Sequence, residues 1–415
     1  MKRAGVEMAS TLRGLWLARE LPFPADMGDR IYSGNLAKAL AEAGADLTFV
    51  GIESKNSQTP PEHWPLKWSR VPGRPRTSIR ALFSTMPLVA ASYATSAYRL
   101  HLRSLMRASW DFVVFDQYGL GWALEIVQSA IPQGKRPILI HVAHDHETSV
   151  CESLYRGFKG SALKRLVLWQ NYVKAKAFER NLASQVELIT AITEEDATKF
   201  VQDVPGVRTV VLKPGFSGAI SSRVVITEET PRRVVLVGSF RWIAKQENLR
   251  QFVKIADPIF AQRGIEFQVV GAMPAKIAEE LEKSTSATRI IGFVERLQPI
   301  LDTARIAVVP ETIGGGFKLK FLDYIFGRVP VATLTHAAAG LPNEIRQAML
   351  CSDSLAELAS GIAGLIDNVA ELNSMQERAL RNAESMFRWS DRGEKLLASI
   401  HECISVRPLN SAERN

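Results

Sequence analysis

A turn with the sequence Gly314-Gly315-Gly316-Phe317-Lys318 is the first place in this chain where side chains could do chemistry. It follows an apolar strand predicted at 306–309 and precedes a predicted helix that ends at Gly327. Glycines let a backbone approach a ligand closely because they carry no Cβ. Free N–H groups at the start of the helix, together with Lys318, would favour an anion, and phosphate is the usual one. Asp323 on the same helix could accept hydrogen bonds from ribose or sugar hydroxyls, so the segment predicts a nucleotide-sugar site.

An alternative is a tight strand-to-helix turn that binds nothing. A glycine-rich turn by itself would favour that alternative, whereas glycines, lysines and a carboxylate together favour a ligand. The spacing fits neither the phosphate loop G-x-x-x-x-G-K-[ST] nor the dinucleotide fingerprint G-x-G-x-x-G.

A second polar cluster follows a strand predicted at 137–142. It reads His141-Val142-Ala143-His144-Asp145-His146-Glu147 and holds three of the seven histidines. One interpretation is a metal site, and another is that His144 or Asp145 orients a sugar or takes a proton from a hydroxyl. A third is satisfied strand-end polar groups, which we favour for His141 because its side chain is expected to face the sheet interior. We select His144 first and Asp145 second as candidate catalytic residues.

The composition predicts a globular chain. It has 415 residues, 46% of them hydrophobic and 23% charged, and this length suggests two domains of about 200 residues each. No apolar run approaches the ~20 residues that a membrane-spanning helix needs. Cys151, Cys351 and Cys403 are few and unpatterned, which argues against a disulfide framework or a zinc site and fits a reducing cytoplasm. The net charge of +8 favours phosphate-bearing ligands, anionic lipid or nucleic acid. The chain has no nucleic-acid-binding motif, so no nucleic-acid partner is expected.

Strands and helices alternate along the chain, which is typical of parallel-sheet α/β domains. A strand at 15–18, a loop with Gly28, a helix at 32–43 and a strand at 46–50 form one βαβ unit. Further strands are predicted at 112–115, 137–142, 188–191, 233–238, 266–270, 289–291, 306–309 and 330–334, with helices at 248–262, 275–283, 354–369, 371–387 and 392–400.

The pattern predicts two domains. The first spans 1–213 and the second 232–388, and proline, glycines and serines without a core pattern mark a linker at 214–231. Residues 389–415 are expected to form a C-terminal helix and polar tail that packs back on the first domain. Two doubly wound domains of this kind leave a cleft between facing strand ends, where ligands bind.

Four segments resemble the retaining GT-B glycosyltransferases of family 4, also called glycosyl transferases group 1. They lie in the family's order, and the resemblance covers nearly all of the chain. They are the loop, helix and strand at 28–50, ITAITEED at 189–196, VLVGSFRW at 235–242 with Asn248, and the glycine-rich segment. The resemblance implies an α/β protein with the GT-B fold, in which two Rossmann-like doubly wound parallel-sheet domains face each other across a cleft.

The resemblance also implies an activity. It is that of a retaining hexosyltransferase, which moves a sugar from a UDP- or GDP-sugar to an acceptor hydroxyl in polysaccharide or glycoconjugate biosynthesis. The partners would be the donor and a glycan, lipid-linked or protein acceptor. No cofactor and no metal are expected, because GT-B enzymes generally stabilise the leaving diphosphate with cationic side chains and helix dipoles. A cytoplasmic location is expected, and a peripheral place at the inner face of the membrane is left open.

The resemblance assigns roles to particular residues. Gly28 and Asp29 belong to a loop near the diphosphate and the acceptor, although Asp29 could also be a helix cap. Arg241 and Lys245 would grip the diphosphate, and the alternative for both is a solvated loop. The full set of donor-binding candidates is Arg241, Lys245, Gly314, Gly315, Gly316, Phe317, Lys318 and Asp323.

The chain departs from the family at one important position. The family frame is Glu-Gly-Phe-Gly-Leu with a second glutamate eight positions after the first. Here Gly315 replaces the first glutamate, which in the family contacts the donor sugar, and Asp323 replaces the second, which contacts the ribose. An alternative is therefore a catalytically weak GT-B homologue that acts as a scaffold or partner subunit. A nucleotide-sugar epimerase shares this fold, but the motifs above do not resemble its acidic and histidine groups.

Two basic stretches, 70–80 and 159–180, lie in the first half of the chain. The second is interleaved with Leu166, Trp169 and Tyr172. Such a surface could rest on an anionic membrane. The alternative is a solvated helix face whose apolar side packs on the core, and both interpretations stay open.

Overall fold

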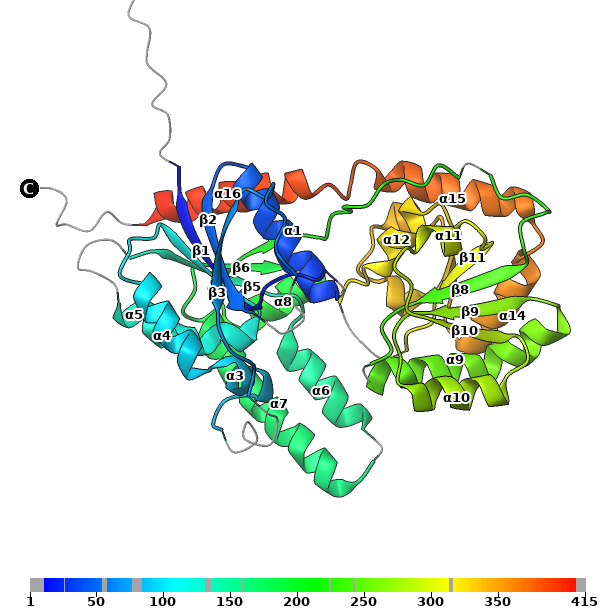
Figure 1. Ribbon diagram of the computed structural model, residues 1–415, viewed down its shortest axis with the longest axis horizontal. Helices are drawn as coiled ribbons and strands as arrows, with labels where there is room; N and C mark the ends of the chain where they lie inside the picture. The colour runs from blue at the N-terminus through cyan, green and yellow to red at the C-terminus, as the bar shows by residue number, and fades with distance from the viewer. Residues whose placement is uncertain are drawn as a thin grey trace, which may run out of the picture. The chain divides into compact units, whose positions relative to one another are not determined.

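The chain divides into two compact units, each built on its own parallel sheet (Figure 1). The first unit consists of Met1–Lys213 with Trp389–Asn415, and the second of Pro214–Arg388. The structure is a computed structural model, and it describes residues 11–25, 27–53, 58–76, 84–130, 136–158, 160–223, 225–241, 243–312 and 316–407.

A seven-stranded sheet forms the centre of the first unit. Its strand order is β3-β2-β1-β4-β5-β6-β7, and every neighbouring pair is parallel. The order reverses between β1 and β4, as in a doubly wound sheet. The strands are β1 (Arg13–Glu20), β2 (Asp46–Ile52), β3 (Leu66–Val71), β4 (Phe112–Asp116), β5 (Ile138–Val142), β6 (Leu188–Ala191) and β7 (Arg208–Val211).

Helices cover both faces of this sheet. α1 packs with α16, and α4 packs with α5, and the two pairs lie on opposite faces (Figure 1). α1 ends just before Gly44, whose φ of +118° suits a residue without a Cβ. The helices are α1 (Gly28–Glu42), α3 (Leu88–Tyr93), α4 (Ser96–Leu105), α5 (Leu124–Ser129), α6 (Glu147–Gly157), α7 (Ala162–Ala183), α8 (Glu194–Asp203) and α16 (Trp389–Val406), with a 3-10 turn at Tyr118–Ala123.

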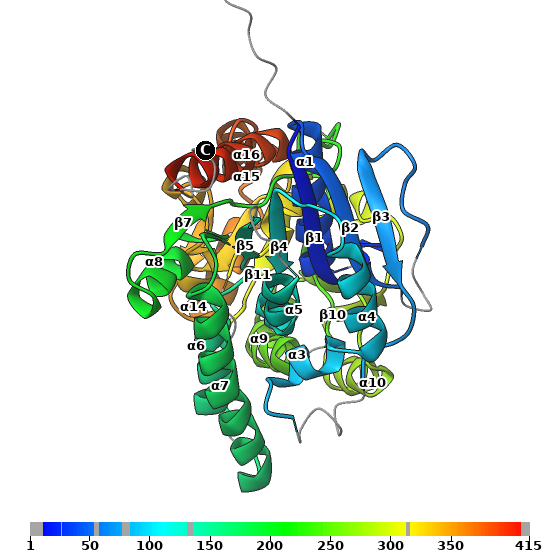
Figure 2. The same ribbon diagram turned by 90° about the vertical axis from the view of Figure 1, so that its left-hand side faces the viewer.

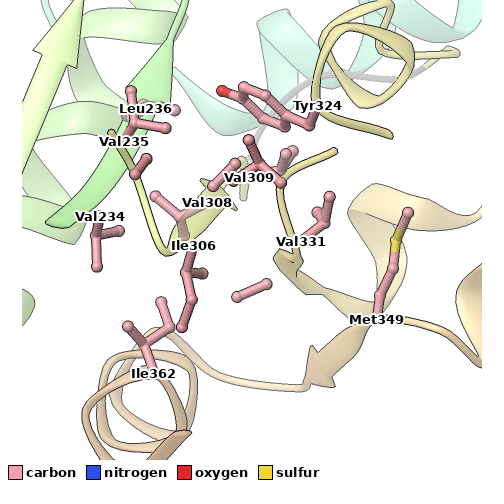
Figure 3. Packing of buried hydrophobic residues seen from close by; sticks show 14 of the residues in the cluster. Val234, Val235, Leu236, Ile306, Val308, Val309, Tyr324, Val331, Met349 and Ile362 are labelled. Atoms are coloured by element: carbon pink, nitrogen blue, oxygen red, sulfur yellow. The ribbon is translucent and has the colours of Figure 1, made fainter. Parts of the chain in front are cut away.

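The second unit has a six-stranded parallel sheet in the order β10-β9-β8-β11-β12-β13. Its central strands are buried on both faces, so they read as continuous apolar runs. Figure 3 shows their side chains packed together with Tyr324, Met349 and Ile362. The strands are β8 (Arg233–Val237), β9 (Glu266–Val270), β10 (Thr288–Gly292), β11 (Ile306–Val309), β12 (Val331–Leu334) and β13 (Leu350–Ser352).

The helices of the second unit connect these strands in turn. They are α9 (Ile243–Gln262), α10 (Ala275–Ser284), α11 (Gln298–Leu301), α12 (Lys320–Phe326), α13 (Asn343–Arg346), α14 (Leu355–Leu365) and α15 (Val369–Ala383), with a 3-10 turn at Thr335–Ala338. None of the helices in the described parts of either unit is both long and apolar enough to cross a bilayer.

The stretch 214–231 packs on the second unit, although its composition suggested a linker. The ring of Phe216 stacks on that of Phe326 with centroids 4.2 Å apart. Ile226 is fully buried, and its N–H donates to Asn373 Oδ1 at 2.8 Å. Most of this stretch is therefore held by the unit that follows it.

The structure confirms the predicted pair of parallel-sheet α/β domains. It adds the strands β3, β7 and β13, which the sequence did not reveal. All three contain half-buried or exposed residues in place of a continuous apolar run, because they lie at or beside the edges of their sheets. Hydrophobic periodicity is weakest in such strands.

Gly393 in α16 tests the packing of the C-terminal helix on α1. A Cβ at this position would lie 2.1 Å from the Ala39 carbonyl oxygen, so one of the two helices would have to move. Gly393→Ala is therefore expected to destabilise the first unit by about 2 kcal/mol, measured by calorimetry or chemical denaturation.

Gly364 in α14 is a matched control, because a Cβ there meets nothing within 4 Å. Gly364→Ala is expected to be neutral or slightly stabilising. Equal stability of the two variants would contradict the close packing of α16 on α1.

Candidate functional site

Polar side chains gather where the strand order of the second sheet reverses, between β8 and β11. Doubly wound sheets bind ligands beyond the carboxyl ends of the strands at this point. Gly238 directly follows β8, and Glu311 follows β11 after one proline. A Cβ on Gly238 would lie 3.6 Å from the Lys320 ammonium nitrogen, so the end of β8 and the start of α12 are neighbours.

Three lysines surround one carboxylate at this edge. Lys320 forms an ion pair with Glu311, and both side chains are nearly buried. The ammonium of Lys318 donates to the Gly316 carbonyl at 3.3 Å. Burial, and then the charges of Lys320 and Lys318, lower the pKa of Lys245, which places Lys245 in the same cluster. Even with the carboxylate of Asp323 counted beside that of Glu311, the three cations leave an excess of positive charge.

Hydrogen bonds fix the chain on the strand side of the glycine turn. Burial by itself would raise the pKa of Glu311, but Lys320 outweighs burial and holds the pKa below its ordinary value, so Glu311 is ionised. The Glu311 carbonyl lies 2.9 Å from His336 Nε2. The next residue, Thr312, donates from its N–H and its hydroxyl to Asn248 Oδ1 at 3.2 and 2.8 Å.

Asp323 and Tyr324 are neighbouring residues of α12 with different environments at this edge. Burial raises the pKa of Asp323 from 3.8 to about 6, and the charge of Lys320 opposes this rise only in part. The Tyr324 hydroxyl accepts a hydrogen bond from the Val237 N–H at 2.7 Å, at the end of β8. Asp323 lies in the first turn of α12, and the hydrogen bond of the neighbouring Tyr324 holds this turn beside the end of β8.

For the remaining residues predicted to bind the donor, the structure gives burial or backbone geometry where it describes them. Gly314 and Gly315 lie outside the described residues. Gly316 has a φ of +70°, which favours glycine. Phe317 is half-buried against the core of the second unit. The side chain of Arg241 is exposed in the loop that follows β8.

The first sheet reverses its strand order between β1 and β4, and a pocket of about 100 Å³ lies at this point. Arg19 and Glu20 line it from the end of β1, and Gln117 lines it from just beyond β4. The first turn of α1 contributes Asp29 and Arg30, and Gly28 is the exposed first residue of that helix.

Each arginine of this pocket is paired with a carboxylate. Arg19 Nη2 lies 2.6 Å from Asp29 Oδ2, and Arg30 forms an ion pair with Glu20. The hydroxyl of Tyr93 donates to the other oxygen of Glu20 at 3.1 Å. The guanidinium of Arg19 also lies over the Tyr93 ring, 5.6 Å from its centroid. The pocket is polar, and each of its two arginines already has a carboxylate partner.

His144 has hydrogen-bond partners at both ring nitrogens. Its Nε2 lies 2.9 Å from Asp116 Oδ1, and its Nδ1 lies 3.2 Å from the side-chain nitrogen of Gln117. The other oxygen of Asp116 accepts from the Trp16 indole at 2.8 Å. Since the Gln117 amide donates to Nδ1, the ring proton is on Nε2 and faces Asp116. His144 would have to release one of these bonds to act as a base.

The other members of the histidine cluster have separate partners. His141 is fully buried, its Nδ1 lies 3.1 Å from the Phe115 carbonyl, and burial lowers its pKa to about 4. His146 contacts Ser149 and Asp203 at 2.8 and 3.1 Å. Within the described residues, no group of three His, Cys, Asp or Glu side chains could hold a metal ion.

Asp145 belongs to a buried acidic group at the start of α6. Burial, followed by the charges of Asp145 and Glu179, raises the pKa of Glu147 to about 8. Glu179 of α7 accepts hydrogen bonds from the N–H groups of Glu147 and Thr148 at 3.0 and 2.8 Å. The carboxyl of Glu147 is therefore mostly protonated at neutral pH.

Sequence reasoning missed several residues of these two sites. Asp116 and Gln117 come directly after the strand predicted at 112–115, so the strand-end argument that selected His144 would have found them too. Glu311 lies within the glycine-rich segment itself, but its ion pair with Lys320 appears only once the turn folds the chain back.

Comparison with known proteins agrees with this architecture. Residues 231–368 match the family model described as "Glycosyl transferases group 1". A search of curated proteins found no match.

Solved structures resemble the chain over nearly its whole length. One is HepE of Anabaena in complex with UDP and glucose, at 14% identity and a TM-score of 0.65, with 94% of this chain and 100% of that chain covered. Another is WaaG, a glycosyltransferase involved in lipopolysaccharide biosynthesis, at 17% identity and a TM-score of 0.66, with 93% and 99% covered. A third is a trehalose-6-phosphate protein of E. coli bound with UDP-2-fluoro glucose, at 13% identity and a TM-score of 0.62, with 94% and 98% covered.

At these identities the structural likeness shows the fold, and the family match adds the type of domain. Residues 231–368 therefore form a domain of the glycosyl transferases group 1 family, in a chain that has the GT-B fold.

Proposed function

We propose that this chain is a retaining hexosyltransferase that moves a sugar from a nucleoside diphosphate to an acceptor hydroxyl in polysaccharide or glycoconjugate biosynthesis. The observation that carries the proposal is the cluster of Lys245, Lys318 and Lys320 beside Glu311 and Asp323, in which three cations against two carboxylates leave an excess of about one positive charge. A nucleoside diphosphate has the complementary charge. UDP is the first candidate nucleotide, because two of the similar structures contain UDP or a UDP-sugar.

The positive charge of the lysine cluster would stabilise the leaving group of the reaction. As the bond between sugar and diphosphate breaks, negative charge grows on the leaving diphosphate. Preorganised cations in a site that excludes water stabilise such charge most effectively. Lys245 and Lys318 are the candidates for direct contact, and the ion pair with Glu311 holds Lys320 in place. Arg241 would add a further cation from the loop after β8, so the proposed reaction uses no metal cofactor.

Asp323 is the proposed partner of the ribose. A carboxylate accepts two hydrogen bonds and can engage both hydroxyls of a ribose diol. Because burial raises the pKa of Asp323 to about 6, the group is mostly ionised at neutral pH and is available as an acceptor. Asp323 would lose part of this capacity below that pH.

Retention needs no side-chain base in this proposal. An oxygen of the leaving diphosphate takes the proton of the acceptor hydroxyl, on the same face of the sugar. We assign His144 to orienting a hydroxyl, for which the ring would exchange its hydrogen bond with Gln117 or Asp116 for one with the ligand. Asp145 remains the second candidate for this role.

We also propose that the α6–α7 hairpin rests on an anionic membrane, at the cytoplasmic face. The hairpin projects from the body of the first unit in both views (Figures 1 and 2). Leu166, Trp169 and Val173 lie on one side of α7 and are 57%, 46% and 46% exposed. Residues 155–176 contain six lysines and arginines and no acidic residue. Exposed apolar residues beside a group of cations are typical of helices at a membrane interface.

The lysine cluster is tested by replacing its members. Wild-type protein is expected to be stabilised against heat by at least one UDP- or GDP-sugar and to release the nucleoside diphosphate slowly. Lys245→Met and Lys318→Met are each expected to weaken nucleotide binding about tenfold to a hundredfold, because a charge-assisted hydrogen bond contributes about 1.5–3 kcal/mol. Thermal shift and nucleotide release measure the two effects.

Lys283→Met is the matched control, since this lysine is exposed on α10 in the same unit. It should bind nucleotide like the wild type. Binding that is unaffected by the Lys245 and Lys318 substitutions would remove the basis of the proposal.

Asp323→Asn tests the buried carboxyl through pH. A pKa raised from 3.8 to about 6 means that ionisation costs folding free energy, so the contribution of this group to stability is full below pH 4 and is lost as the pH rises through 6. The variant should therefore match the wild type below pH 4 and exceed it by about 2–3 kcal/mol at pH 8, as measured by urea unfolding without nucleotide. Asp353→Asn, which removes an exposed carboxylate of the same unit, controls for the loss of charge. A difference from wild type that is independent of pH would contradict the assignment.

The hairpin is tested by flotation with phosphatidylglycerol vesicles. Leu166→Glu combined with Trp169→Glu is expected to reduce the bound fraction about tenfold, because it places two acidic groups where apolar side chains would enter the interface. Leu100→Glu is the control, since Leu100 is 70% exposed on α4, away from the hairpin. Wild-type protein that stays unbound, or a double variant that floats like the wild type, would refute the contact.

A further inference from the structure

The pocket at the β1–β4 reversal contains two arginines that are both already paired. Arg19 pairs with Asp29, and Arg30 pairs with Glu20, and all four side chains are between 17% and 26% exposed. Such partly buried charges are screened by salt much less than surface charges. The pairing therefore decides which ligand charge this pocket tolerates.

The charges that line the pocket sum to about −1. Two guanidinium groups face three carboxylates, which are those of Glu20, Asp29 and Asp116. The two oxygens of Asp116 contact His144 and Trp16, so this carboxylate already has its main partners. A phosphate ester that entered would meet these three like charges, and any guanidinium N–H that it contacted would belong to an arginine whose charge a carboxylate already compensates.

Hydroxyl groups meet no such obstacle. A hydroxyl both donates and accepts, and each carboxylate oxygen has more than one lone pair, so Glu20 and Asp29 can accept from a ligand while they keep their ion pairs. Ser33 adds a hydroxyl to the lining. The ring of Tyr93, with Arg19 over one part of it, adds an apolar surface of the kind that packs on the C–H groups of a sugar.

We infer that this pocket takes an uncharged, hydroxyl-rich part of the acceptor, such as a glycosyl unit, and rejects a phosphate ester at the same position. Its role as an acceptor site rests on the proposed function. Its preference for uncharged over phosphorylated sugars is a binding property of the first unit, which can be measured without a donor.

The direct test compares matched sugars. Glucose, mannose and N-acetylglucosamine are each titrated against the full chain beside their 6-phosphates, by ligand-observed NMR. At least one uncharged sugar is expected to bind about tenfold more tightly than its phosphate. Equal or tighter binding of the phosphates, or no binding of any uncharged sugar, overturns the inference.

A gain of binding makes the test sharper. Glu20→Gln removes the carboxylate that pairs with Arg30 and keeps its shape, so it should raise the affinity for the 6-phosphate about tenfold and leave the uncharged sugar within about threefold. Asp29→Asn, which releases Arg19, is a second variant with the same expectation. Glu53→Gln is the control, because it also breaks an arginine ion pair, with Arg70 at 2.8 Å, but Glu53 does not line the pocket.

The result separates this inference from the proposed function. UDP is titrated into the same samples. A chain that binds UDP but prefers the phosphate esters, or whose Glu20→Gln and Asp29→Asn variants gain no affinity for them, overturns the inference alone. A chain that shows the sugar preference but binds no nucleotide overturns the proposed function and leaves the preference of the pocket established.

Discussion

The reversal of strand order in each parallel sheet is the constraint on which both candidate sites depend. All strands of a parallel sheet end at the same edge, and right-handed crossovers carry the chain away on one face or the other. Where the order reverses, neighbouring connections leave on opposite faces, so the strand ends between them stay uncovered. This happens between β1 and β4 and again between β8 and β11. The apolar strands fill the core and have few polar groups to offer, so the chemistry of this chain is confined to the residues just beyond their ends.

The two reversal points differ in charge, and the separate roles proposed for them rest on this difference. Beyond β8 and β11, three lysines against Glu311 and Asp323 leave positive charge that suits a diphosphate. Beyond β1 and β4, each arginine already has its own carboxylate, and His144 has partners at both nitrogens. That environment suits hydroxyl groups. On this basis we propose one edge for the charged part of a donor and the other for the uncharged part of an acceptor.

The sequence predicted the fold wherever burial imposed a continuous apolar run. The strands expected at 266–270 and 306–309 agree with β9 and β11 to the residue. The edge strand β3 was missed, because exposed polar residues interrupt its pattern. Among the candidate site residues, those next to a buried strand could be selected from the sequence, whereas their partners from other strands could not. His144 was found because it follows a buried strand. Its partner Asp116 lies 28 positions earlier, and only the pairing of β4 with β5 brings the two together.

Side-chain pairing was the part that the sequence could not supply. The order of residues does not reveal that Arg19 pairs with Asp29 or that Arg30 pairs with Glu20. These ion pairs depend on how the first turn of α1 packs against the end of β1. The replacement of the family's first glutamate by Gly315 was visible in the sequence. Glu311 lies four positions earlier in the sequence, but only the structure shows that it is ionised and forms an ion pair with Lys320.

The central claim is that a nucleoside diphosphate binds beyond β8 and β11, next to the lysine cluster. Hydrogen–deuterium exchange of the full chain with and without UDP tests it most directly. The account predicts slower exchange in the loop and first turns that follow β8, around Lys245, and in the segment from Thr312 to Asp323. Protection that appears only elsewhere in the chain, or no protection at saturating UDP, would contradict it.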